Sequence, residues 1–271
     1  MNALTVTGAA EAVLAAIGRG DAVVTVSVIS DARPNSATGA RIVITSAGET
    51  LGSLGPADEA ALQLAQRALE KRTPQLESAV IAGSSLRLFA EPVFPTQRLV
   101  IVGAGHIAVP LASMGRLIDF DVLVLDDREE FATGERFAEG VRVERMDFER
   151  PFESLRIDRN TYVVLVTRAH KHDYDALRHL LDQAEPPGYV GMIGSRRRVR
   201  ATFDALESAG YDPERFRSIH APVGLDIGAE TPAEIAVSIA AEIIRVRSGE
   251  GTSQKLVERE RIIDRFYPGN G

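Results

Sequence analysis

The chain has 271 residues, of which 45% are hydrophobic and 25% charged, the composition of an ordinary soluble protein with one large or two modest domains. With a net charge of −7, nothing in the composition favours a surface for nucleic acid or an anionic membrane, so neither is an expected partner. The absence of cysteine excludes disulfides, thiolate metal sites and a persulfide held on this protein. No signal peptide or membrane-spanning run is visible, so we expect a cytoplasmic protein.

The first 95 residues are predicted to form a small α/β domain. Apolar residues at helical spacing and valine-rich alternating runs indicate its elements. The expected helices cover 9–17 and 57–71, and the expected strands cover 22–29, 41–45, 51–54, 79–81 and 86–90. A proline-containing linker over 91–96 then leads into a second domain.

Strands and helices alternate over residues 96–250. The expected strands lie near 99–102, 122–125, 141–144, 162–166, 189–193 and 218–221, and the expected helices near 107–117, 174–183, 197–208 and 232–246. Alternation with short connections predicts a Rossmann-like α/β domain, with a mostly parallel sheet covered by helices on both faces. Residues 251–271 are expected to be a tail, in which 254–266 has the composition of a charged helix.

The segment RLVIVGAGHIA, residues 98–108, has the strand, glycine turn and helix order of a dinucleotide-binding unit. Gly103 permits the tight turn, and Gly105 lets the backbone approach a pyrophosphate closely. Ala108 takes the place of the usual third glycine and still allows close packing of helix on strand. The N–H groups that open the helix offer a site for an anion. His106 lies inside the turn and faces either the crevice or solvent.

A second apolar run, 122–125, ends at Asp126 and Asp127, where a ribose-binding acid is expected. Asp126 is the predicted acceptor for a ribose 2′-hydroxyl. The two acids together disfavour a 2′-phosphate by charge repulsion, and Arg128 offsets that repulsion. The alternative interpretation is a doubly wound domain whose crevice has lost its nucleotide or binds another ligand.

Further polar loops follow the later strands, at the carboxyl ends where open α/β sheets bind their ligands. They cover 167–173, 194–198 and 221–231. The predicted cofactor-binding residues in them are Thr167, Arg168, His170, Gly194, Ser195, Arg196, Gly224, Asp226 and Glu230. We expect these residues and the glycine turn to converge on one common cleft.

Each loop also has a purely structural interpretation. His170 and His172 are more often solvated or hydrogen-bonded than metal-bound in such a loop, so no metal site is predicted. The arginine run at 196–198 is either a solvated helix start or an anion site, and cations at a helix N-terminus oppose the helix dipole. Ser195 and Thr231 are good N-caps. No nucleophile–base pair is evident, so no catalytic residue is assigned.

Five stretches of the second domain together resemble the XdhC/CoxI family, the accessory proteins of xanthine dehydrogenase and related molybdenum hydroxylases. They are LVIVGAGHIA (99–108), VLVLDDREEFA (122–132), VVLVTRAHKHD (163–173), GYVGMIGSRRR (188–198) and APVGLDIGAETPAEIAVSIAAEI (221–243). They cover nearly the whole domain in the expected order. The resemblance implies a Rossmann-type domain behind a small amino-terminal domain.

The resemblance also implies a function: binding of the molybdenum cofactor and help in its maturation and insertion into an apo molybdenum hydroxylase, such as a xanthine dehydrogenase-like enzyme. Homodimers are usual in such proteins, which act as chaperones more than as catalysts. The amino-terminal domain departs from the family pattern. Gly52-Ser-Leu-Gly55 lacks the cysteine that commonly follows this turn, and a family Ser-x-Pro-Arg signature is matched only loosely over 30–34. Cofactor handling through a thiol is therefore excluded.

Two other function classes fit the residues. An NAD-dependent oxidoreductase for a small carbonyl or hydroxyl substrate would need a proton donor, for which His170, His172 and Tyr174 are candidates, but none lies in a known dehydrogenase motif. A nucleotide-sensing module is the third class, since fold does not determine function. NAD(P) thus stands beside the molybdenum cofactor as a candidate ligand of the crevice.

Overall fold

The structure is a computed structural model that describes residues 2–31, 37–81, 83–153 and 155–248. The chain divides into two compact units between Thr96 and Gln97. The predicted helix at 254–266, and most of the 30–34 segment, lie outside the described residues. No helix in the described ranges combines the length and hydropathy that a membrane span requires.

The first unit is an antiparallel five-stranded sheet in the order β3-β2-β1-β5-β4. Its elements are α1 (Val6–Gly18), β1 (Val23–Asp31), β2 (Arg41–Thr45), β3 (Thr50–Leu51), α2 (Asp58–Lys71), β4 (Gln75–Ile81) and β5 (Ser84–Val93). Helix α2 packs on one face of the sheet, and α1 packs on residues of β1 and β2 that point the other way. The predicted alternation of β1 places its valines in these two cores.

The strand predicted over 51–54 was too long, because β3 ends at Leu51. Gly52 follows with a φ of +88°, and Leu54 turns into the core at 1% exposure. The carboxylate of Asp58 accepts from the Ser53 hydroxyl at 2.7 Å, and this bond fixes a turn where a strand was expected. The linker predicted over 91–96 likewise begins later, since β5 runs on to Val93.

The second unit is a fully parallel sheet of six strands, in the order β8-β7-β6-β9-β10-β11. Its elements are β6 (Arg98–Val102), α3 (Ala108–Leu117), β7 (Asp121–Asp126), β8 (Arg142–Arg145), β9 (Thr161–Leu165), α4 (His170–Leu181), β10 (Tyr189–Met192), α5 (Arg196–Ser208), β11 (Ile219–His220) and α6 (Pro232–Ser248). Counted from β6, this is the 3-2-1-4-5-6 order of the dinucleotide-binding Rossmann fold.

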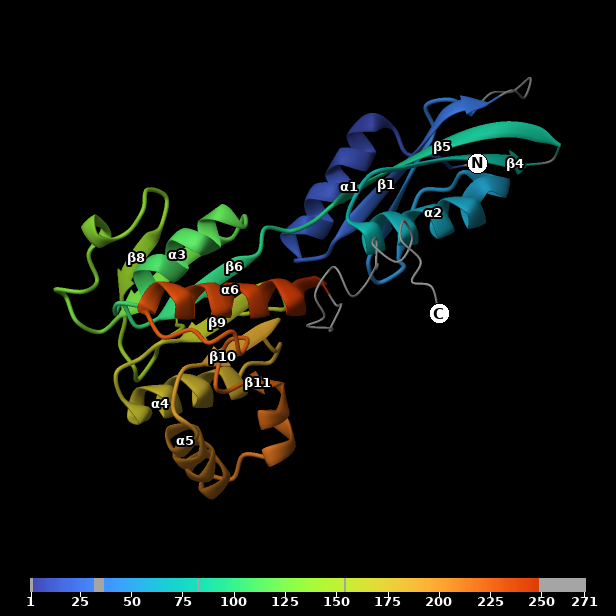
Figure 1. Cartoon of the computed structure of the whole chain (residues 1–271). Helices are drawn as coiled ribbons and strands as arrows, with labels where there is room; N and C mark the ends of the chain where they lie inside the picture. Colours follow the sequence, from blue (N-terminus) through green and yellow to red (C-terminus); the bar gives the residue numbers. More distant parts are fainter. Residues whose placement is uncertain (1, 32–36, 82, 154, 249–271) are drawn as a thin grey trace, which may run out of the picture. The chain divides into compact units, whose positions relative to one another are not determined.

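Helices cover both faces of this sheet, as Figure 1 shows for α3 and α6 on one side and α4 and α5 on the other. The central strands are buried on both faces, apart from Arg98 and Asp121 at the starts of β6 and β7, because one set of alternate residues packs under α3 and α6 and the other set under α4 and α5. The predicted Rossmann-like fold is confirmed. Helix α4, however, begins at His170, four residues before the predicted start. The prediction missed this first turn because the turn is polar and has no apolar periodicity.

Candidate functional site

A pocket opens at the carboxyl ends of β6 and β9, the point where the order of the strands reverses. Chain connections leave these two neighbouring strands in opposite directions, which is what creates a crevice in a doubly wound sheet. The pocket has a volume of about 280 Å³. Its lining includes the predicted residues Gly103, Gly105, His106, Asp126, Asp127, Arg128, Thr167 and Arg168, together with Phe131, Phe148, Val166 and His172. We call it the glycine-turn pocket.

Gly103 makes the sharp turn off β6. Its φ is +104°, and a Cβ on it would lie 2.7 Å from the carbonyl oxygen of Val166. Two strand ends therefore approach each other more closely here than any side chain allows. A Cβ on Gly105, in contrast, would meet no atom within 4 Å, so its space is open toward a ligand.

We expect Gly103→Ala to destabilise the second unit by about 2–4 kcal/mol, because the substitution combines a left-handed backbone with a clash against backbone. The chain has no tryptophan, and all five tyrosines follow Thr96, so tyrosine fluorescence during urea unfolding reports on this unit. Gly134→Ala is the matched control, since Gly134 has an ordinary φ and open space around its Cβ position. Equal stability of the two variants would contradict the close approach.

Asp126, the predicted acceptor for a ribose hydroxyl, has its carboxylate occupied by contacts within the protein. It is 1% exposed, and its carboxylate accepts from the Ala104 N–H at 2.6 Å and from the Arg128 N–H at 3.0 Å. The Arg128 guanidinium adds two bonds of 2.9 Å each. Burial raises the pKa of Asp126, but the bonds from Arg128 and Ala104 outweigh it and hold the pKa below the usual range. The carboxylate thus fixes the glycine turn and has no free site for a ribose hydroxyl.

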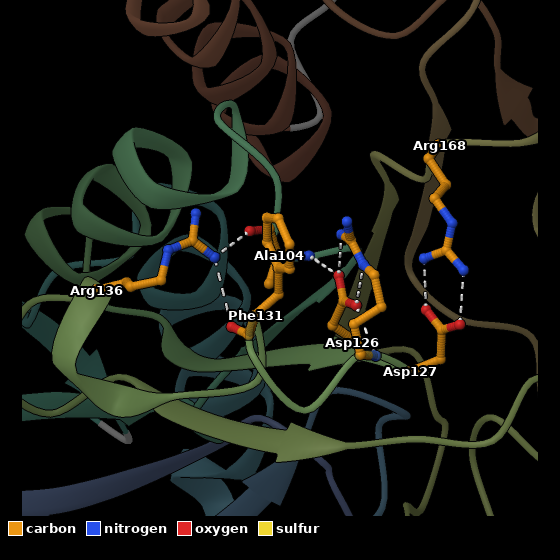
Figure 2. Close-up of polar contacts among 7 residues, drawn as sticks. Ala104, Asp126, Asp127, Phe131, Arg136 and Arg168 are labelled. Carbon is orange, nitrogen blue, oxygen red and sulfur yellow. Dashed lines mark hydrogen bonds and ion pairs between the residues drawn. The ribbon is translucent and has the colours of Figure 1, made fainter.

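The neighbouring acid, Asp127, makes a different contact. Both of its oxygens accept from the guanidinium of Arg168 at 2.8 Å, so the loop after β7 is tied to the loop after β9 (Figure 2). On the other side of the turn, Arg136 donates to the carbonyl oxygen of Ala104 at 2.7 Å. Arg136 therefore holds the glycine turn directly, and the Asp127–Arg168 pair joins the loops beside it.

His172 forms part of the pocket wall. Its ring stacks on Phe148 with the ring centroids 3.9 Å apart, and its Nδ1 is buried without a partner among the described residues. Burial lowers the pKa of His172, and the charge of Arg168 lowers it further. His172 is consequently neutral near pH 7 and contributes a flat, uncharged surface to the pocket.

A second pocket of about 530 Å³ lies beyond the end of β10. It includes the predicted residues Gly194, Ser195, Arg196, Gly224 and Asp226, with Ile193, Pro222, Val223, Leu225, Ile227, Ala229, Ile235 and Ser238. We call it the α5 pocket. Ser195 caps α5 as predicted, accepting from the Arg198 N–H at 3.3 Å. The two pockets share no lining residue, so the residues expected in one common cleft divide between them.

Arg198 separates the two pockets, a role that the sequence did not indicate. Its guanidinium donates to Asp173 Oδ2 at 2.7 Å and to the carbonyl and hydroxyl oxygens of Thr167 at 3.0 and 2.9 Å. Asp173 has no exposed surface and also accepts from the Thr167 hydroxyl at 2.6 Å. Burial raises the pKa of Asp173, and the bonds from Thr167 and Arg198 offset this only in part.

A second buried acid, Glu242 of α6, supports the loop that forms one wall of the α5 pocket. Its carboxylate accepts from the Tyr189 hydroxyl at 2.7 Å and the Gly224 N–H at 2.8 Å, and it lies 3.2 Å from His220 Nδ1. Burial raises its pKa, but these partners more than compensate and lower it to about 2. One signal was visible in the sequence: Glu242 falls on the apolar face of its helix, four residues after Ser238.

The remaining predicted residues lie outside both pockets. Ala108 is the fully buried first residue of α3, His170 is an exposed residue of the first turn of α4, and Glu230 is exposed on the loop before α6. Thr231 and Glu234 form the predicted capping box, with bonds of 3.3 and 2.8 Å. Within the described ranges, no group of three or more histidine, aspartate or glutamate side chains is placed to hold a metal ion.

The arrangement therefore consists of a Rossmann sheet, a glycine turn, and polar pockets at the carboxyl ends of its strands. A family model described as the XdhC Rossmann domain matches residues 99–243, which include the turn and both pockets. This chain belongs to the XdhC family.

Individual relatives agree with the XdhC assignment. The chain is 30% identical over 223 residues to the uncharacterized protein YqeB of Escherichia coli (strain K12), a match that covers 77% of this chain and 40% of that protein. It is 34% identical over 160 residues to a probable xanthine dehydrogenase subunit of Bacillus subtilis (strain 168), covering 59% of this chain and 46% of that one. The chain thus spans less than half of the length of these curated relatives.

Among solved structures, the chain is similar to a crystal structure described as a xanthine dehydrogenase from Bacillus halodurans. The match covers 92% of this chain and 98% of the chain in that structure. The two are 19% identical, and the TM-score is 0.49.

Proposed function

We propose that this chain is a cytoplasmic accessory protein of a molybdenum hydroxylase, which binds the molybdenum cofactor in the glycine-turn pocket and delivers it to the apoenzyme. The observation that carries the proposal is membership of the XdhC family combined with a pocket whose donors suit a phosphorylated ligand. The apoenzyme would be a xanthine dehydrogenase-like protein, as the name of the Bacillus subtilis relative suggests. A homodimer is part of the proposal.

The backbone supplies the anion-binding groups. Among the described residues, the N–H groups of Gly105, His106 and Ile107 donate to no acceptor, and they stand where α3 begins. Such groups bind a phosphate or pyrophosphate, helped by the helix dipole. The phosphate tail of a pterin cofactor would lie here. Its transfer requires no bond to be made or broken by the protein, which agrees with the lack of an assigned catalytic residue.

The α5 pocket would hold a second polar part of the ligand or a group of the receiving enzyme. Arg196 and Ser195 lie at its edge, where α5 begins, and Asp226 lines it from the loop before α6. Arg198, Asp173 and Thr167 form a hydrogen-bonded group that we call the Arg198 cluster. It keeps this pocket next to the glycine turn, because Arg198 contacts Thr167 on one side and lies 3.2 Å from the Cβ position of Gly194 on the other.

Gly105→Leu is expected to abolish cofactor retention without unfolding the chain, since the new side chain enters the open space beside the turn. The protein is incubated with molybdenum cofactor released from a denatured molybdoenzyme, desalted and oxidised, and the retained pterin is measured by its fluorescence. The same samples are then tested for activation of an apo xanthine dehydrogenase.

Gly134→Leu is the matched control, because Gly134 is exposed and lines neither pocket. It should retain and deliver the cofactor like the unaltered protein. If Gly105→Leu also retains the pterin, the glycine-turn pocket is not the binding site; if the unaltered protein retains none, the proposed function is wrong.

A dinucleotide such as NAD(P) is the second ligand candidate. The strand order and the glycine turn favour it, because both are features of dinucleotide-binding folds. It would bind in the same glycine-turn pocket.

A further inference from the structure

Two neighbouring acids, Asp126 and Asp127, lie beside the glycine turn, and their contacts decide which of them can bind the ribose of a ligand. Asp126, the last residue of β7, occupies the position that usually binds the ribose, but its carboxylate already accepts four hydrogen bonds. That number is about the full capacity of a carboxylate. Its 1% exposure means that a ligand would have to break buried bonds to reach it.

Asp127 remains available. Its side chain is 28% exposed and lines the glycine-turn pocket, and each of its oxygens accepts one bond from Arg168. Arg168 is 45% exposed. Ion pairs with this much exposure contribute little to stability, so a ligand can exchange for either partner at low cost.

The position of the pair matters as much as its exposure. Asp127 follows β7 and Arg168 follows β9, and these strands flank β6 in the sheet. The pair therefore bridges the two loops on either side of the glycine turn (Figure 2). A phosphate bound at the start of α3 would come next to Arg168, and the sugar attached to it next to Asp127.

We propose that this pocket binds a nucleotide, that Asp127 rather than Asp126 accepts its ribose hydroxyls, and that Arg168 turns from Asp127 to a phosphate of the same ligand. The proposal rests on the proposed function, since it names the class of ligand for the same pocket: a nucleoside diphosphate group, either free or as part of a larger cofactor.

The surroundings provide a place for the base. A larger cavity of about 1060 Å³ adjoins the glycine-turn pocket and shares Asp127, Phe148 and His172 with it. The stacked rings of Phe148 and His172 offer a flat surface, and the unpartnered Nδ1 of His172 is a hydrogen-bonding atom without a use in the described chain. The base of a nucleotide whose ribose is bound at Asp127 would extend into this cavity.

The test is calorimetric titration of the full chain with ADP, 2′-deoxy-ADP and inorganic pyrophosphate. The unaltered protein should bind ADP about tenfold more tightly than 2′-deoxy-ADP, the effect of one hydrogen bond to a charged group. Asp127→Asn should remove this difference and leave pyrophosphate binding unweakened, because Arg168 is then free. Arg168→Gln should weaken all three ligands.

Asp121→Asn is the matched control. Asp121 lies at the opposite end of β7, where it pairs with Arg98 and Arg142, and its loss should change none of the affinities. Thermal melts confirm that each variant folds. Failure of the unaltered protein to bind ADP, or retention of the ribose preference in Asp127→Asn, overturns this inference. The titration contains neither pterin nor apoenzyme, so its failure leaves the cofactor-retention result intact, and failure of that experiment leaves this one intact.

Discussion

Arg198→Met is expected to destabilise the second unit by about 3–5 kcal/mol, the usual cost of leaving a buried charge without its partner. Asp173 has no exposed surface, and Arg198 is the cation that neutralises it. The substitution also removes the donor that holds the Thr167 carbonyl and hydroxyl. Urea unfolding followed by tyrosine fluorescence measures the free energy of unfolding.

Two further variants make this result specific. Arg200→Met removes an arginine of the same helix whose side chain is 84% exposed, and it should change stability by less than about 0.5 kcal/mol. Asp173→Asn should cost less than Arg198→Met, because the remaining guanidinium is 23% exposed and can be solvated, whereas a remaining buried carboxylate cannot. Equal effects of Arg198→Met and Arg200→Met would show that the cluster does not hold the wall between the two pockets.

Acidification gives the second large effect, through Glu242. A carboxyl group whose folded-state pKa is lower than its unfolded-state pKa stabilises the fold above the unfolded value and loses that contribution as the pH falls. Here the pKa falls from an ordinary 4.5 to about 2 in the folded protein. The contribution is roughly 3 kcal/mol at pH 7 and disappears between about pH 5 and pH 2.

Glu242→Gln isolates this contribution. We expect the variant to be less stable than the unaltered protein at pH 7, and the difference to shrink as the pH falls from 5 toward 2. The measurement is a set of urea unfolding curves across this range, with Glu139→Gln, an exposed glutamate of the same unit, as control. A stability difference that stays constant with pH would mean that Glu242 acts only by its shape.

Most of the second unit could be predicted from the sequence. Parallel strands buried on both faces are continuous apolar runs, and such runs mark β6, β7, β9 and β10 regardless of what surrounds them. The glycine turn is equally local, since glycine at position 103 permits the positive φ that the turn requires. Capping at Ser195 and Thr231 depends on neighbours three residues away. For these features the local sequence was sufficient.

The roles of the acidic residues could not be predicted from the local sequence, because the role of a carboxylate depends on which donors reach it. Asp126 and Asp127 are adjacent and chemically identical, yet one is saturated by Ala104 and Arg128 while the other meets Arg168, 41 residues away. Asp173 and Glu242 likewise acquire their partners from other elements, Asp173 from helix α5 and Glu242 from strand β10. The division of the predicted cleft into two pockets has the same origin, since Arg198 reaches across to Thr167 only in the folded sheet.

The sequence by itself determined the Rossmann unit, its glycine turn and the XdhC family, because these depend on apolar runs and residue types that are local along the chain. Only the tertiary structure decided which acid anchors the turn, which acid faces the pocket and what separates the two pockets. The physical reason is that hydrogen-bond saturation and burial of a charge are set by groups that the fold brings together from distant parts of the chain.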